Sequence, residues 1–309
     1  MKYLATLLAI TLLFNCSNSD NGSEEEAQFC GIYEGDIFLP SDDAIREFGK
    51  CNYTEITGYL SIGESSYAFT ITDLSPLSSI SKVGGALLLH SLRELNNLNG
   101  LHNIESATRL SIAYAEALEN LDDLDKLQTR DIALSNNYAL QNIDGLDMES
   151  DTIGTIGIIN SPLLTNLNCF SNIKTISNAF SIEGCDSLID LGGLNNVKSI
   201  GELYSSSCCG ALVIKDNFLM ESIDGLEKLT FLGGPLNIRN NTYLENLDGL
   251  KNLVYLHGDI DIYDNSLLRR FCGLQNLFLT NGQVNGDFNV YNNYNNPTQT
   301  MIMNAPACD

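Results

Sequence analysis

The sequence predicts a mainly β, single-domain solenoid of about ten coils, and two observations carry this prediction. First, a pair of apolar residues of the Leu-x-Ile type recurs about every 24 residues along most of the chain. Second, apolar residues return at every third position after each pair, as in the stretch from Leu236 to Leu256. One coil of this kind cannot bury its apolar side chains alone, so neighbouring coils must stack and share a core.

Each apolar pair marks a short predicted strand, because successive side chains of a strand point to opposite faces and alternate residues can point inward. The pairs are Leu60 and Ile62, Leu87 and Leu89, Leu110 and Ile112, Ile132 and Leu134, Ile156 and Ile158, Phe180 and Ile182, Leu212 and Ile214, Leu236 and Ile238, Ile260 and Ile262, and Phe288 and Val290. The following steps of three suit turns or 3₁₀ segments. Longer spacings after the first pair, around Ser205 to Cys209 and before the last pair predict protruding loops.

Residues 1–15 have the features of a signal peptide. Lys2 precedes an apolar run from Tyr3 to Phe14 that is too short to span a bilayer. Cys16 follows, and residues 16–29 are polar and acidic. This arrangement resembles a bacterial lipoprotein signal of the Bacteroidetes type, which implies lipidation of Cys16, a flexible acidic tether over residues 16–29 and a lipid-anchored, surface-exposed protein of the outer membrane. The alternative is ordinary secretion with Cys16 as an unpaired thiol.

The strongly acidic balance limits the classes of partner. The formal net charge is −23 at pH 7. Phosphate backbones are repelled by such a chain, so nucleic acid is not expected as a partner. An anionic ligand would need a local basic patch.

Eight cysteines remain when Cys16 is set aside, and an even number in an exported protein suits disulfides. Cys30 and Cys51 bracket a predicted N-terminal cap over residues 30–57, and Cys272 and Cys308 bracket the other end, where residues 292–309 form a predicted C-terminal cap. We predict one disulfide at each end. The pairing of the remaining four cysteines stays open, with a Cys208 to Cys209 bond as one alternative; these four are Cys169, Cys185, Cys208 and Cys209.

The N-terminal cap contains a predicted helix. Ser41 is placed to cap it, Asp42 and Asp43 supply acids in its first turn, and Gly49 ends it. Ile45 and Phe48 lie three residues apart, so both side chains fall on one helical face and can cover the open end of the first coil.

Two positions recur for structural reasons. An asparagine column, comprising Asn137, Asn217, Asn241, Asn265 and Asn293, lies three residues beyond the strands, where amides can pair with buried turn backbone. Asp-Gly recurs at residues 144–145, 224–225 and 248–249, where glycine permits a positive φ. Stacked Asp224 and Asp248 could form a calcium site, but each coil supplies one carboxylate, so no metal site is predicted.

Several stretches carry a family resemblance. Residues 31–37 read Gly-Ile-Tyr-Glu-Gly-Asp-Ile before the cap helix, residues 54–63 lead into the first strand, residues 72–80 follow it, and Leu-x-Asn-Leu-Asp-Gly-Leu recurs. Residues 30–309 thus resemble the receptor L-domain-like branch of the leucine-rich-repeat superfamily in its exported bacterial form. The resemblance implies a right-handed solenoid, with repeats over residues 58–291, that serves extracellular recognition or adhesion and has no shared catalytic residues. Cys169 and Cys272 depart from the pattern at turn positions.

The outward residues of the predicted strands form the candidate face for a ligand. The position after each apolar pair holds His90, Ala113, Ser135, Ile159, Glu183, Lys215, Arg239, Tyr263 and Tyr291. Stacked strands lie about 4.8 Å apart, so charged and aromatic side chains adjoin one another from Glu183 onward. We define the candidate face as Glu183, Lys215, Asn237, Arg239, Asp261, Tyr263, Asn289 and Tyr291. The alternative is a solvated sheet face with cross-strand salt bridges such as Glu183 to Lys215.

The expected function is non-catalytic recognition or adhesion by a monomer that binds an extracellular protein or a glycan. The absence of Trp removes the best side chain for stacking on a sugar, which counts against the glycan. The alternative is a polysaccharide-processing enzyme on a β-helix, because Asp259, Asp261, Asp264 and Asp287 crowd the last coils. No Gly-x-Ser-x-Gly, His-Glu-x-x-His or phosphate-loop motif is present, so no catalytic residue and no cofactor are predicted.

Overall fold

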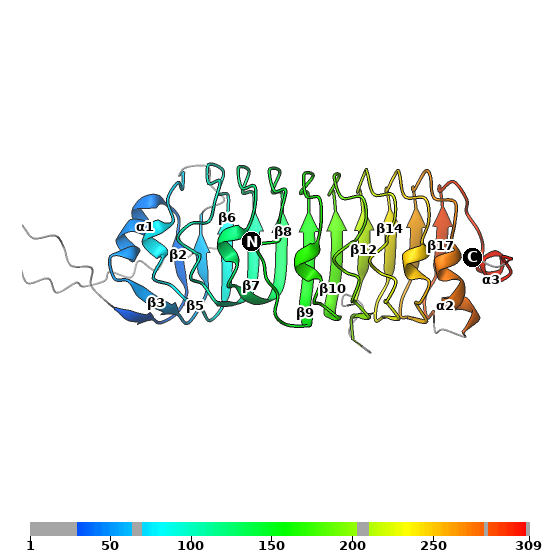
Figure 1. Cartoon of the computed structure of the whole chain (residues 1–309), viewed down its shortest axis with the longest axis horizontal. Coiled ribbons are helices and arrows are strands. Elements are labelled where there is room, and N and C mark those ends of the chain that lie inside the picture. The colour runs from blue at the N-terminus through cyan, green and yellow to red at the C-terminus, as the bar shows by residue number, and fades with distance from the viewer. Residues whose placement is uncertain (1–29, 64–69, 203–209, 281–283, 307–309) are drawn as a thin grey trace, which may run out of the picture.

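The computed structural model describes residues 30–63, 70–202, 210–280 and 284–306. In these residues the fold is mainly β, with one parallel sheet of 17 strands and few helices. Figure 1 shows an elongated molecule in which the strands lie side by side along the long axis. Neighbouring strands in the sheet are separated by 22 to 32 residues of sequence, as between β7 and β8 and between β10 and β12.

The strands form two rows that merge in the middle of the sheet. One row contains β2 (Ile37–Leu39), β4 (Leu60–Ile62), β6 (Ala86–His90), β12 (Leu212–Lys215), β14 (Leu236–Arg239), β16 (Ile260–Tyr263) and β17 (Phe288–Tyr291). The other contains β1 (Gly31–Tyr33), β3 (Tyr53–Ile56), β5 (Lys82–Val83), β11 (Ser199–Ile200), β13 (Phe231–Leu232) and β15 (Tyr255–Leu256). Four long strands belong to both rows: β7 (Ser106–Ala113), β8 (Gln128–Ser135), β9 (Thr152–Ile159) and β10 (Thr175–Glu183).

All ten predicted apolar pairs lie in strands, but the predicted number of strands was too low. The sequence pattern missed β2 and the six short strands of the other row. Strand β2 contains the apolar pair Ile37 and Leu39, in register with Leu60 and Ile62, and the prediction left this pair out. The six other segments contain two to four residues and carry no repeated apolar pair. Their extended backbone is held by parallel pairing with the next coil, as between β13 and β15, which a local pattern does not reveal.

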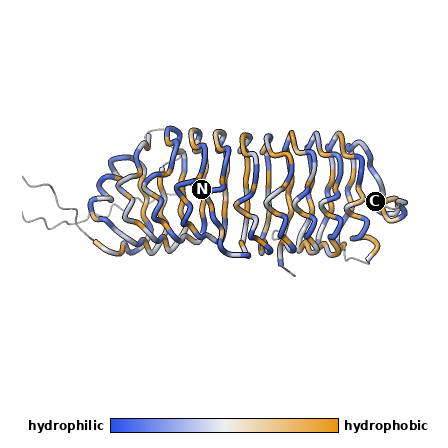
Figure 2. The backbone as a smooth tube through the Cα atoms, in the orientation of Figure 1, coloured by the Kyte–Doolittle hydropathy of each residue, from blue (hydrophilic) through white to orange (hydrophobic). Residues whose placement is uncertain are grey.

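The core is built from the repeated leucines and isoleucines. In the coil that begins with β14, Leu236, Ile238 and all five leucines from Leu244 to Leu256 are fully buried. Figure 2 shows hydrophobic and hydrophilic residues alternating around each turn. The steps of three include the predicted 3₁₀ segments, η1 (Ser75–Leu77), η2 (Asp122–Leu124), η3 (Asn168–Phe170), η4 (Asp248–Leu250) and η5 (Cys272–Leu274).

The predicted cap helix is confirmed as α1 (Asp42–Gly49). The Ser41 hydroxyl accepts a hydrogen bond from the backbone N–H of Ala44 at 3.3 Å, and Ile45 is fully buried. Two short helices that were not predicted, α2 (Gln275–Leu279) and α3 (Gln299–Met303), lie at the other end and pack together. Ile302 of α3 is buried in the common core, so this helix covers the last coil.

The backbone angles at two of the three Asp-Gly turns differ from the prediction. Gly225 has φ +108°, as predicted, but neither Gly145 nor Gly249 has a positive φ. A side chain at Gly249 would instead collide with the carbonyl oxygen of Ile223 in the preceding coil. Glycine is required at that turn because the neighbouring backbone comes close, and not because of its dihedral angles.

The cysteines differ from expectation at the N-terminal end. Cys30 and Cys51 are neighbours, with the Cys30 N–H donating to the Cys51 carbonyl at 2.7 Å, but both are free thiols and the predicted disulfide is not formed. Their thiols contact each other, and this contact raises the pKa of Cys30. Cys272 is disulfide-bonded, and the pairing with Cys308 stays a prediction. Four other cysteines lie outside the described residues: Cys16, Cys208, Cys209 and Cys308. The predicted loop around Ser205 also lies outside them.

Candidate ligand-binding face

The asparagine column holds the turns that follow the strands. Asn241 is fully buried; its Nδ2 donates to the carbonyl of Ile214 at 3.0 Å, and its Oδ1 accepts from the backbone N–H of Asn217 at 3.1 Å. Asn217 and Asn265 repeat these contacts one coil away on either side. The predicted role of the column in pairing buried turn backbone is therefore confirmed.

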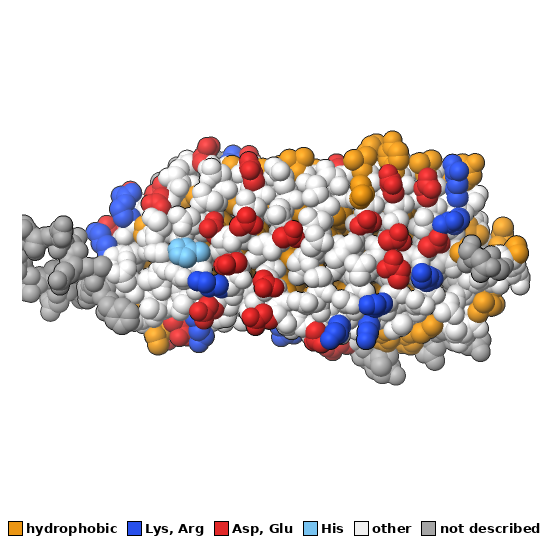
Figure 3. Space-filling view, viewed as in Figure 1, with side chains coloured by type: hydrophobic (Ala, Val, Ile, Leu, Met, Phe, Trp, Pro, Cys, Tyr) orange, Lys and Arg blue, Asp and Glu red, His pale blue; other side chains and the backbone are white. Residues whose placement is uncertain are grey.

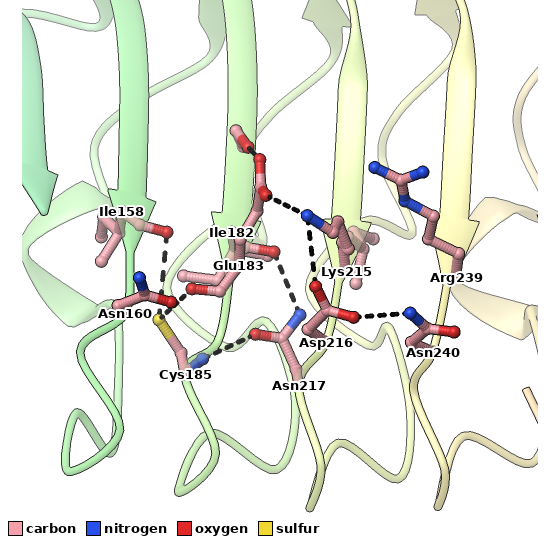
Figure 4. A network of polar contacts seen from close by, with 12 residues as sticks. Ile158, Asn160, Ile182, Glu183, Cys185, Lys215, Asp216, Asn217, Arg239 and Asn240 are labelled. Carbon is pink, nitrogen blue, oxygen red and sulfur yellow. Dashed lines mark hydrogen bonds and ion pairs between the residues drawn. The ribbon is translucent and has the colours of Figure 1, made fainter. Parts of the chain in front are cut away.

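Two other residue types occupy the column in the middle of the molecule. Ser161 and Cys185 stand where asparagine is found in later coils, and both are fully buried. The Cys185 thiol lies 3.7 Å from the carbonyl of Glu183, and burial raises its pKa to about 12 (Figure 4). Cys185 is a free thiol that completes the core, which accounts for one of the cysteines left unpaired by the sequence.

The candidate face is assembled by strand register as predicted. Glu183, Lys215, Arg239, Tyr263 and Tyr291 are consecutive partners on β10, β12, β14, β16 and β17. Asn237, Asp261 and Asn289 form a second row two residues earlier on the last three of these strands. The eight residues therefore lie on one side of neighbouring strands.

Ion pairs occupy the amino end of the face. Lys215 Nζ lies 3.1 Å from Glu183 Oε2 and 3.2 Å from Asp216 Oδ2, so it stands between two carboxylates (Figure 4). The hydrogen bonds that Lys215 donates to Glu183 and to Asp216 raise its pKa. The cross-strand salt bridge that the alternative of a solvated sheet face predicted is therefore present, and Lys215 has little remaining capacity for an anionic ligand.

The carboxyl end of the face is aromatic. Arg239 Nη1 donates to the Tyr263 phenol oxygen at 2.6 Å, and this hydrogen bond raises the pKa of Arg239. The rings of Tyr263 and Tyr291 stack with centroids 4.8 Å apart and planes 5° from parallel. Tyr291 keeps 46% of its surface exposed, so the stack ends on an accessible ring.

Two polar atoms of β14 are buried without a hydrogen-bond partner among the described residues. They are Asn237 Oδ1 and Arg239 Nε, which belong to side chains on the same side of one strand. In the next coils the corresponding groups are paired, since Asn289 Nδ2 donates to Asp261 Oδ1 at 2.9 Å. The centre of the candidate face thus contains buried polar atoms without hydrogen bonds. Unpaired buried groups of this kind lower the stability of the folded state.

Three of the four crowded carboxylates of the last coils, Asp259, Asp261 and Asp264, accept hydrogen bonds from neighbouring groups. Asp259 accepts from the backbone N–H of Asp287 at 2.8 Å, and Asp264 accepts from Asn292 Nδ2 at 3.0 Å. Asp248 pairs with Arg270. Within residues 30–63, 70–202, 210–280 and 284–306, no three His, Cys, Asp or Glu side chains are placed to hold a metal ion.

One row beside the face was not recognised from the sequence. The residue directly before the column has a positive φ in each coil from Ser91 onward, and many of these residues are Asn or Asp: Asn136, Asn160, Asp216, Asn240, Asp264 and Asn292. Their side chains bond across coils, as Asn240 Nδ2 does to Asp216 Oδ1 at 2.7 Å. The recurrence of Asn or Asp before the column was the available signal, since these residues tolerate left-handed backbone.

No protein-family model matches the chain, and no curated protein matches it. No helix in the described part of the chain is long and apolar enough to cross a membrane.

Proposed function

We propose that this chain is an exported, lipid-anchored and non-catalytic recognition or adhesion protein, which binds an extracellular protein or a glycan through the candidate face. The anchor would be Cys16, and the cell surface would be the site of action. The proposal needs no cofactor and treats the molecule as a monomer.

The proposal includes a finer account of the fold. The parallel sheet would be one side of a right-handed solenoid of the receptor L-domain-like, leucine-rich-repeat kind. Support comes from the regular offset between paired strands, the buried steps of three and the bonded asparagine column. In repeat proteins the stacked face is the usual binding surface.

The observation that carries the function is the change of chemistry along one row of register partners. The preceding strands place His90, Ala113, Ser135 and Ile159 in this row, whereas the later strands place three charged residues and a stacked tyrosine pair there. A packed sheet face does not require Arg239 to bond a phenol or leave buried polar atoms unpaired. A surface that recognises a ligand commonly combines aromatic and polar groups in this way.

Screening the purified protein against arrays of glycans and extracellular proteins tests the proposed function. A ligand of the face should be bound more weakly by Arg239→Ala and Tyr263→Ala, by about tenfold or more for a central contact. Ser135→Ala is the matched control, because Ser135 occupies the same row on β8 and should leave binding unchanged. Binding that survives both face variants would refute the face.

The anchor is tested separately. Metabolic labelling with palmitate should mark the native protein and should be lost in Cys16→Ala, since acylation requires the thiol. Equal labelling of the two proteins would remove the anchor from the proposal and leave the candidate face untouched.

A further inference from the structure

A patch of exposed apolar side chains lies on the edge of the molecule where the strands end. It contains Ile189, Phe218, Leu219 and Tyr243, whose exposed fractions are 52%, 50%, 42% and 42%. None of the four belongs to the candidate face. Figure 3 shows hydrophobic side chains gathered along this edge around β12 and β14, with acidic side chains next to them. We call these four residues the edge patch.

The edge patch spans three successive coils. The rings of Phe218 and Tyr243 contact edge to face, with centroids 5.4 Å apart. The N–H of Glu221 bonds the carbonyl of Ile189 at 2.9 Å, which joins the turn after β10 to the turn after β12. Single exposed apolar residues are ordinary on a protein surface, but adjacent ones on three coils mark an interaction surface.

Acidic groups and no basic ones occur in the turns that carry the patch. Residues 184–196, 216–227 and 240–250 contain eight carboxylates and no Lys or Arg, and two of the eight pair with basic residues outside these turns, Asp216 with Lys215 and Asp248 with Arg270. Asp186 lies against the patch, since its Oδ1 accepts the backbone N–H of Phe218 at 3.1 Å. Glu221 and Glu245 lie on neighbouring coils two residues after Leu219 and Tyr243, and the Glu245 N–H donates to the Glu221 carbonyl at 3.1 Å.

This combination selects the chemistry of the partner. Two copies of a chain with formal charge −23 would bring acidic edges together, and an anionic membrane surface would be repelled. Phe218 and Tyr243 present flat rings, but Leu219 and Ile189 do not, so the patch as a whole suits apolar side chains better than a sugar. We propose that the edge patch binds a segment of a partner protein that presents apolar side chains flanked by Lys or Arg.

Three synthetic peptides of equal length test this inference with the full-length protein. One alternates Leu and Lys, one Leu and Glu, and one Ser and Lys, and binding is followed by fluorescence anisotropy. The Leu/Lys peptide should bind, and its affinity should fall by about tenfold or more in Phe218→Ser/Tyr243→Ser and in Glu221→Gln/Glu245→Gln. Added salt should also weaken it, because exposed charges are screened.

Two control variants distinguish binding at the edge patch from non-specific binding and from binding at the candidate face. Tyr114→Ser removes an equally exposed tyrosine, 47% accessible, and should not change binding. Arg239→Ala should also leave peptide binding intact, so failure of the proposed function and failure of this inference are distinguishable. Circular dichroism confirms that each variant is folded.

Several results would overturn the inference. Equal binding of the Ser/Lys peptide would show that charge alone attracts it, and equal binding of the Leu/Glu peptide would show that the carboxylates play no part. Absence of binding, or binding that both double variants retain, would remove the patch as the site. Loss of glycan binding in Phe218→Ser/Tyr243→Ser would assign the edge to a sugar instead.

Discussion

The guanidinium of Arg239 on β14 donates to the phenol oxygen of Tyr263 on β16, and the donor and acceptor atoms are 2.6 Å apart. The two residues are direct register partners, so the bond ties one coil to the next on the outside of the sheet. The guanidinium carbon also lies 5.8 Å from the centre of the Tyr263 ring. The aromatic and cationic groups of the candidate face therefore form one unit.

Replacing Tyr263 by Phe should separate hydrogen bonding from stacking. The ring can still stack on Tyr291, but the bond to Arg239 is lost, and we expect a loss of about 0.5–1.5 kcal/mol in the free energy of unfolding. Urea unfolding measures the change. Tyr255→Phe is the control because Tyr255 stacks on Phe231 in the other row; an equal loss in both variants would contradict the assigned role of the phenol.

Replacing Asn241 by Leu should be among the most damaging changes in the chain. The substitution leaves the Ile214 carbonyl and the Asn217 N–H buried without partners, at about 1–3 kcal/mol for each group. The loss should appear as a lower urea midpoint. Ser266→Ala, which removes one exposed hydrogen bond to the Thr242 carbonyl, should change stability little, and a comparable effect would count against the column.

Protonation of His90 should lower the stability of the protein as the pH falls. Burial lowers the pKa of this half-buried imidazole below its ordinary value of 6.5, so the folded state binds its proton less readily than the unfolded state. The contribution of neutral His90 to the free energy of unfolding is fully present above pH 6.5, and it is lost as the pH falls from 6.5 towards the pKa of His90 in the folded state. Urea unfolding of wild type and His90→Asn between about pH 7.5 and 5 isolates this effect. A difference between the two proteins that does not vary with pH would refute it.

The four described free thiols should divide into two classes. Burial raises the pKa of Cys169 and Cys185, so neither should react with a thiol reagent until the protein unfolds. Cys30 and Cys51 adjoin each other, and mild oxidation should join them and raise the free energy of unfolding by about 3 kcal/mol. Mass spectrometry would detect the bond as a loss of two hydrogens, absent in Cys30→Ser. Oxidation without a gain in stability would show that the bridge distorts the cap.

The sequence predicted the parts of this molecule that repeat. Leu236 and Ile238 predict β14 because burial requires the same residue types in each coil. The shared strand register then places Arg239 beside Tyr263. Strand β13 was missed because its backbone is held by the next coil and not by its own pattern. The edge patch escaped notice because Phe218 and Tyr243 sit in turns, where position in sequence does not disclose exposure.

The asparagine column also gives the molecule a direction. Asn241 bonds backbone groups that come before it in the chain, namely the Asn217 N–H and the Ile214 carbonyl, and Asn265 does the same for Asn241 and Ile238. A turn of the chain is therefore finished only by the residues that follow it. During synthesis on the ribosome, each newly made coil would therefore complete the hydrogen bonds of the coil before it. A chain truncated at its C-terminus would leave its last turn without these bonds. A chain truncated at its N-terminus would not.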